Sequence, residues 1–81
     1  MSNLKTVNVE GVEYQLQHPG ARWYLRLADR HRNRHGVMQS EGYISELFEN
    51  VVVEPKVTID DFSNVGEMEK LVQEIEQFLR S

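Results

Sequence analysis

The sequence predicts a single α+β domain in which an N-terminal β-hairpin is followed by three helices. Two periodicities support this fold class. Before Pro19, apolar and polar residues alternate, as in a strand with one buried face. After Pro19, apolar residues recur every three or four positions in three separate segments, as in amphipathic helices. A chain of 81 residues supports one hydrophobic core, so residues 1–81 are expected to form one domain.

The hairpin is predicted over residues 5–17. Its two alternating segments lie on either side of Glu10-Gly11. A two-residue turn at this dipeptide would place Val9 opposite Val12 and Val7 opposite Tyr14, with all four side chains on one face. The register that the turn requires therefore agrees with the apolar pattern.

The first helix is predicted over residues 19–34. Pro19 suits a first helical turn, and Gly36 is a stop signal. Arg22, Arg26 and Arg30 form a basic ridge on one side of this helix. The apolar side chains fill an arc of roughly 200° on the other side. They are Ala21, Trp23, Tyr24, Leu25, Leu27 and Ala28.

Two further helices are predicted over residues 40–51 and 64–80. Ser40 is a suitable N-cap for the first of them, and the β-branched residues 51–53 end it before Pro55. The last helix has an apolar stripe that runs from Val65 to Leu79. Between these helices, Lys56–Ile59 fits either a short strand beside the hairpin or an extended linker, and the pattern does not decide between them.

Composition restricts the class of protein. The chain has no cysteine, which excludes disulfides and thiolate metal sites and favours a reducing compartment. Residues 1–10 lack the apolar segment of a signal peptide, and no apolar run reaches the roughly 18–20 residues that span a bilayer. The net charge of −4 is divided unevenly. Residues 1–40 hold six basic and three acidic side chains, whereas residues 41–81 hold three basic and ten acidic ones, so opposite-signed surfaces are expected.

The sequence indicates no catalytic residues, no metal site and no cofactor. His31 and His35 have the i, i+4 spacing of a metal pair, but a third ligand is missing and the flanking arginines would repel a cation. His18 has no nucleophile motif to serve, and we expect it to form a local hydrogen bond at the strand-to-helix turn. Asp60-Asp61 lacks the alternating ligands of a calcium loop. We therefore expect a binding protein and not an enzyme.

The first helix is the best candidate for the binding surface. Five arginines within residues 22–34, next to two aromatic residues, could follow a phosphate backbone, but the acidic chain as a whole argues against nucleic acid. Trp, Tyr and Arg dominate protein-binding hot spots, and a small core does not easily cover all the apolar side chains of this chain. The predicted partner-binding residues are Trp23, Tyr24, Arg26, Leu27 and Arg30.

The stretch Leu16–Phe62 resembles the tail assembly chaperones of long-tailed phages and prophages of Gram-positive bacteria. This stretch covers a little over half of the chain, and the acidic last helix continues it. The residues behind the resemblance are Leu16-Gln17-His18-Pro19-Gly20, Asp29-Arg30, Asn33, Gly36-Val37, Gln39, Val51-Val52-Val53-Glu54-Pro55-Lys56-Val57 and Asp60-Asp61-Phe62.

The resemblance implies a non-enzymatic chaperone that keeps the tape measure protein soluble during tail assembly. It further implies a protein of the bacterial host cytoplasm that is absent from the mature virion, and a longer form that recruits the tail tube protein. The chain would then be a compact member, the shorter of two frameshift products, or a fragment. Opposite-signed surfaces favour a homo-oligomer along one long partner. Two alternatives remain open: a small nucleic-acid-binding regulator that uses the arginine-rich helix, and a structural head–tail or tail component.

Overall fold

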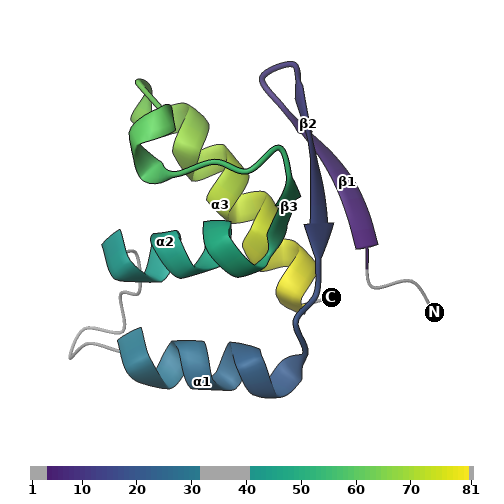
Figure 1. Cartoon of the computed structure of the whole chain (residues 1–81), viewed down its shortest axis with the longest axis vertical. Helices are drawn as coiled ribbons and strands as arrows, with labels where there is room; N and C mark the ends of the chain where they lie inside the picture. The colour runs from purple at the N-terminus through teal and green to yellow at the C-terminus, as the bar shows by residue number, and fades with distance from the viewer. Residues whose placement is uncertain (1–3, 32–40, 81) are drawn as a thin grey trace.

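The computed structural model of the chain describes residues 4–31 and 41–80, with only the backbone of residue 31. Two strands, β1 (Leu4–Val9) and β2 (Val12–Gln17), are followed by α1 (Ala21–His31) and α2 (Glu41–Asn50). A short strand β3 (Val52–Glu54), a 3₁₀ turn η1 (Ile59–Asp61) and α3 (Val65–Arg80) complete the order. The strands form one antiparallel sheet in the order β1-β2-β3. The helix α3 packs across the sheet, α2 lies beside it, and α1 lies on the far side of α2 (Figure 1).

The predicted fold class and hairpin register are confirmed. Val9 pairs with Val12 and Val7 with Tyr14. Glu10 and Gly11 both have positive φ angles, 51° and 84°, which is the backbone of the two-residue turn that matches strand twist. The Asn8 side-chain oxygen accepts a hydrogen bond from the Gly11 N–H group at 3.2 Å and supports the turn.

A third strand is the main addition to the predicted fold. It lies at Val52–Glu54, immediately after α2, and Lys56–Ile59 is not a strand. In β3, Val52 pairs with Leu16 and Glu54 with Gln15, so Val53 is an extra residue in the strand. The β-branched residues that end α2 therefore also form the strand that pairs with the second edge of β2. This pairing matters because backbone N–H and C=O groups next to the core need hydrogen-bond partners.

The predicted helix bounds agree with the structure to within one or two residues wherever both can be compared. The helices lie at 21–31, 41–50 and 65–80, against predictions of 19–34, 40–51 and 64–80. The predicted end of the first helix at residue 34 and the Ser40 cap lie outside the described residues. In the described part of the chain, no helix combines the length and the apolar character needed to cross a bilayer.

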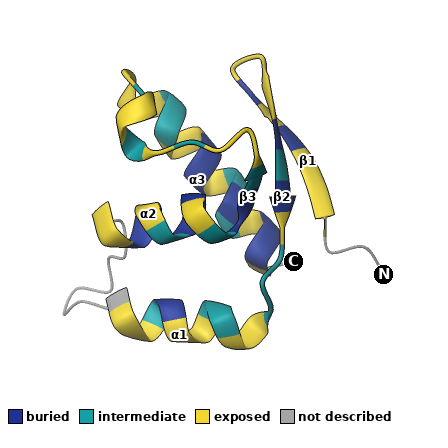
Figure 2. Cartoon of the chain, viewed as in Figure 1, coloured by how far each residue is buried: buried dark blue, intermediate teal, exposed yellow. Residues whose placement is uncertain are grey.

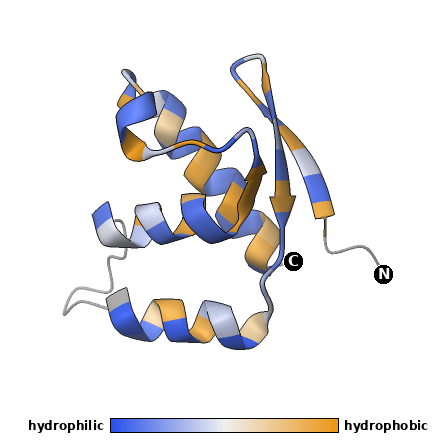
Figure 3. Ribbon diagram, viewed as in Figure 1, coloured by the Kyte–Doolittle hydropathy of each residue, from blue (hydrophilic) through white to orange (hydrophobic). Residues whose placement is uncertain are grey.

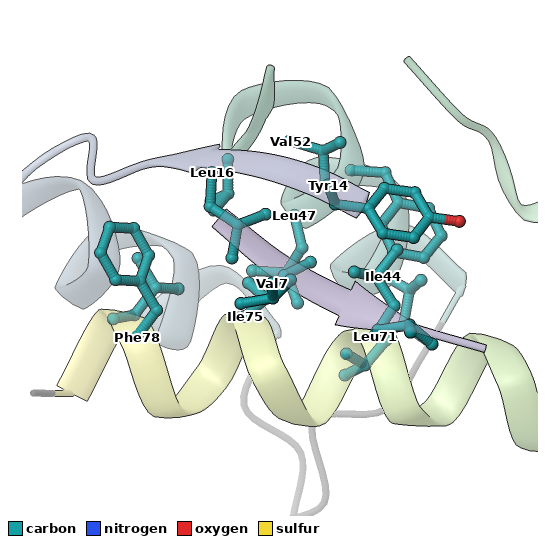
Figure 4. Packing of buried hydrophobic residues seen from close by; sticks show 14 of the residues in the cluster. Val7, Tyr14, Leu16, Ile44, Leu47, Val52, Leu71, Ile75 and Phe78 are labelled. Atoms are coloured by element: carbon teal, nitrogen blue, oxygen red, sulfur yellow. The ribbon is translucent and has the colours of Figure 1, made fainter. Parts of the chain in front are cut away.

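The core lies between the sheet, α2 and α3 (Figure 4). The predicted stripe of α3 is buried from Leu71 to Leu79, but its first member, Val65, is 67% exposed. The buried residues of the described chain are all hydrophobic. Tyr43 and Phe48 are the largest fully buried side chains, and both come from α2. Labelled members of the core in Figure 4 are Val7, Tyr14, Leu16, Ile44, Leu47, Val52, Leu71, Ile75 and Phe78.

Candidate partner-binding surface

Helix α1 presents one side to the core and the other to solvent (Figure 2). Leu27 is fully buried on the inner side, and Trp23 and Tyr24 are partly buried against the core. The outer side carries Arg22, Leu25, Arg26 and Asp29, which are all exposed. These four follow the i, i+3, i+4, i+7 spacing of one helix face. Hydrophilic and hydrophobic residues accordingly alternate along α1 (Figure 3).

The five predicted contact residues do not form one accessible surface. Leu27 has 0% exposure, so it is a core residue. Its prediction as a partner-binding residue is therefore wrong. Arg26 is exposed, whereas Trp23 and Tyr24 offer only part of their rings to solvent. The inner side of α1 is covered by the rest of the fold because the domain needs this apolar surface for its own small core.

Arg30 is held by an ion pair with Glu46 of α2. Glu46 lies within reach of Arg30 because α1 packs beside α2. An exposed ion pair contributes little stability, but it reduces the net positive charge of the ridge. All three ridge arginines are exposed, but only Arg22 and Arg26 lie outside this ion pair.

Leu25 is the large apolar residue that the sequence pattern placed in the apolar arc and that the structure leaves exposed. Its exposed fraction is 62%, the second largest among the exposed large hydrophobic residues of the described chain. Leu25 and Trp23 lie at opposite edges of the arc, and the structure covers the half centred on Leu27. The position of Leu25 at the arc edge, next to Arg22 on the helical wheel, is the only signal in the sequence for this exposure.

His18 connects the start of α1 to the end of α3. Its Nδ1 atom accepts a hydrogen bond from the Gly20 N–H group at 2.9 Å, which is the local bond expected from the sequence. Nε2 therefore carries the proton and donates to the Leu79 carbonyl oxygen at 3.0 Å. The ring also meets Phe78 edge-on, with centroids 5.6 Å apart. Both ring nitrogens of His18 are engaged in hydrogen bonds to the backbone, so neither is available as a general base.

A second polar contact joins α1 to the same end of α3. The Arg80 Nε–H group donates to the Tyr24 hydroxyl oxygen at 3.2 Å. Together with His18 and the Arg30–Glu46 pair, this contact sets the position of α1 relative to α2 and α3. The exposed face of α1 is therefore presented by a helix that is held at both ends.

Tyr43 is a core residue whose hydroxyl group joins α2 to α3. Its hydroxyl donates to the Glu76 carboxylate at 2.7 Å. Burial raises the pKa of the Tyr43 hydroxyl well above its usual value, and the hydrogen bond to Glu76 adds to this effect. Burial also raises the pKa of Tyr14, where the nearby Glu67 and Asp61 carboxylates act in the same direction.

We expect the stability of the domain to fall as the pH rises above about 10, where an unfolded tyrosine loses its proton. The folded chain retains the Tyr43 proton there, so the unfolded state binds fewer protons and becomes favoured. Tyr43→Phe should make this fall shallower, although the Tyr14 contribution remains. Thermal unfolding midpoints measured from about pH 8 to about pH 11 test this. Equal slopes for the two proteins would contradict the role of Tyr43.

The described residues offer little for catalysis or metal binding. Among residues 4–31 and 41–80, no three histidine or acidic side chains are grouped as metal ligands. The predicted histidine pair involves His35 and the His31 side chain, which lie outside the description. One polar hollow of about 270 Å³ lies between the hairpin turn and α3, and Lys70 is ion-paired with Glu10 at its edge. A second hollow of about 260 Å³ lies between α2 and Val57-Thr58.

Comparison of the chain with protein-family models, with curated proteins and with solved structures gave no match.

Proposed function

We propose that this protein is a non-enzymatic phage tail assembly chaperone that binds amphipathic helices of the tape measure protein and keeps that protein soluble. It would act in the cytoplasm of the bacterial host and be absent from the mature virion. A longer form of the chain would recruit the tail tube protein. The resemblance of Leu16–Phe62 to this family motivates the proposal, and the surface of α1 is compatible with it.

The observation that supports this function best is a stripe on one edge of α1. Trp23, Arg26 and Arg30 follow the i, i+3, i+7 spacing, so they lie along one side of the helix. Trp23 is partly exposed beside the exposed Arg26, and Arg30 is positioned by Glu46. An aromatic anchor next to guanidinium groups is the composition of a hot spot, and it suits the apolar face and acidic flanks of an amphipathic helix.

The charge distribution of the structure favours this function over nucleic-acid binding. Phosphate backbones are bound by several free cations along one track. In this protein, one of the three ridge arginines is paired with Glu46, and the adjacent helix α2 carries exposed Glu41 and Glu49. These carboxylates would repel a polyanion that follows α1. A protein partner with an apolar face and fewer acidic groups carries less negative charge and is repelled less.

Coexpression with the large coiled protein encoded just downstream tests the proposal. The chain is expected to move that protein from the insoluble to the soluble fraction and to copurify with it. Arg26→Glu should weaken the complex roughly tenfold, because it reverses a charge in the proposed contact without touching the core. Arg22→Glu is the matched control on the outer face and should have a much smaller effect.

An insoluble downstream protein in the presence of the wild-type chain would refute the chaperone role. Equal losses for the two arginine variants would place the contact elsewhere on α1. Detection of the chain in purified particles would instead favour a structural component of the virion.

A further inference from the structure

The outer edge of β1 is a backbone surface that the proposed function leaves unused. β1 is an edge strand of the sheet, because β2 lies between it and β3 (Figure 1). Within residues 4–31 and 41–80, β2 is the only strand that pairs with β1. An edge strand carries a row of N–H and C=O groups that can pair with another extended chain. With six residues, β1 has the usual length of a strand and offers a full row of such groups.

The hairpin register shows which backbone groups face outward. Val9 precedes the two-residue turn, so it exchanges both hydrogen bonds with its partner on β2. Bonded and non-bonded pairs alternate along an antiparallel ladder, so the N–H and C=O groups of Thr6 and Asn8 point away from β2. The same alternation turns the Gln17 N–H group away from β1, and this group indeed donates to the Val51 carbonyl oxygen at 2.8 Å.

The polar hollow between the hairpin turn and α3 opens along this edge. Asn8 and Val9 lie on opposite faces of β1, yet both line the hollow, so the hollow lies at the edge of the strand. Its opposite wall is one side of α3, with residues at i, i+3, i+4 and i+7. These residues are Lys70, Gln73, Glu74 and Gln77. The hollow has a volume of about 270 Å³, so it gives room to side chains of a strand added to β1.

The lining of the hollow selects polar side chains. It includes the amide side chains of Asn8, Gln73 and Gln77, and the Lys70–Glu10 ion pair lies at its turn end. An apolar occupant would remove water from these groups without replacing the lost hydrogen bonds. Hydroxyl and amide side chains can both donate and accept, so they can replace those bonds. The hollow therefore fits serine, threonine, asparagine or glutamine side chains.

Lys5 sets the charge at the other end of this edge. It alternates with Val7 and Val9, so it lies on the face of β1 that they occupy, but it is exposed. A carboxylate on an added strand, opposite Lys5, would complement its charge. A second copy of β1 is a poor occupant, because the register that pairs Thr6 with Asn8 places Lys5 opposite Val9 and not opposite a carboxylate.

We propose that the β1 edge binds an extended segment of a partner protein as a fourth, antiparallel strand. This segment has hydroxyl or amide side chains toward the hollow and one carboxylate opposite Lys5. Its backbone pairs with the N–H and C=O groups of Thr6 and Asn8, which fixes its register. The proposed contact with tape measure helices lies on α1, on the far side of α2 (Figure 1), so the two partners can bind at the same time.

Titration of the isotopically labelled chain with the acetylated and amidated peptide Thr-Asn-Thr-Thr-Thr-Asp-Thr tests the proposal. In the antiparallel register, its asparagine lies opposite Val9, its aspartate opposite Lys5, and threonines opposite Thr6 and Asn8. The backbone amide signals of Thr6 and Asn8 should shift on binding, with a Kd of about 1 mM or tighter, and the signals of α1 should not.

Methylation of the peptide backbone provides a matched pair of controls. N-methylation of the two threonines opposite Thr6 and Asn8 removes the N–H groups that face β1, and it should weaken binding at least about tenfold. N-methylation of the threonine between them removes an N–H group that faces away from β1, so it should have a much smaller effect. Equal losses for the two peptides would overturn the proposal.

A charge exchange tests the role of Lys5. The wild type should prefer the aspartate peptide to one with lysine in its place by about threefold, and Lys5→Glu should reverse this preference. Lys56→Glu makes the same charge change at an exposed lysine after β3 and should keep the wild-type preference. The proposal also fails if no β1 signal shifts or if Lys5→Glu still prefers aspartate. Because no tape measure sequence is present, these outcomes are independent of the coexpression result.

Discussion

Replacing Leu27 by alanine is expected to lower the free energy of unfolding by about 2–5 kcal/mol, the range for truncating a buried leucine. Among the described side chains of α1, over residues 21–30, Leu27 is the fully buried one. Its removal leaves a cavity between α1 and the rest of the core, where the helix can move only partly to fill the space. A domain of this size has only about 4–12 kcal/mol of total stability, so the variant would approach the unfolding threshold.

Leu25→Ala is the matched control for this prediction. It removes the same atoms from the same helix at a position that is 62% exposed. We expect a change within about 0.5 kcal/mol, because little buried surface is lost. Urea unfolding at low protein concentration measures both values. Similar effects for the two variants would show that α1 does not pack through Leu27.

The second large effect is expected for His18→Ala, with a loss of about 2–3 kcal/mol. This substitution removes the acceptor for the Gly20 N–H group, the donor to the Leu79 carbonyl and the edge contact with Phe78. The variant should loosen both the entry to α1 and the last turn of α3. Faster amide hydrogen exchange at these two places, together with urea unfolding, would detect it.

His18→Asn separates the two hydrogen bonds. An asparagine oxygen can accept from an N–H group two residues later, as in an Asx turn, but the side chain is too short to reach Leu79. We therefore expect Asn to restore part of the stability, with fast exchange persisting at the end of α3. If Asn were as harmful as Ala, the local bond to Gly20 would contribute nothing measurable.

Much of the fold followed from local pattern. The alternation on either side of Glu10-Gly11 determined the strand pairing, because a one-residue shift would turn every apolar side chain of the hairpin to solvent. The apolar spacing from Leu71 to Leu79 determined the buried face of α3 in the same way. These segments have one apolar face each, so the pattern leaves a single choice of what to bury.

The candidate site was less predictable, and α1 shows why. Its apolar arc is wider than the surface that one neighbouring helix can cover. The pattern predicted that Leu25 and Leu27 share this arc, but the position of α2 and the end of α3 buried Leu27 and exposed Leu25. Contacts between distant residues, such as His18 with Leu79 and Arg30 with Glu46, have no local signature at all.

The sequence by itself determined the α+β class, the hairpin register, the approximate helix bounds and the uneven distribution of charge. These properties depend on residue order within one element. Only the tertiary structure decided that Val52–Glu54 pairs with β2, which half of the α1 arc is covered, and that a polar hollow forms between β1 and α3. Each of these depends on how elements distant in sequence pack around a core too small to cover every apolar side chain.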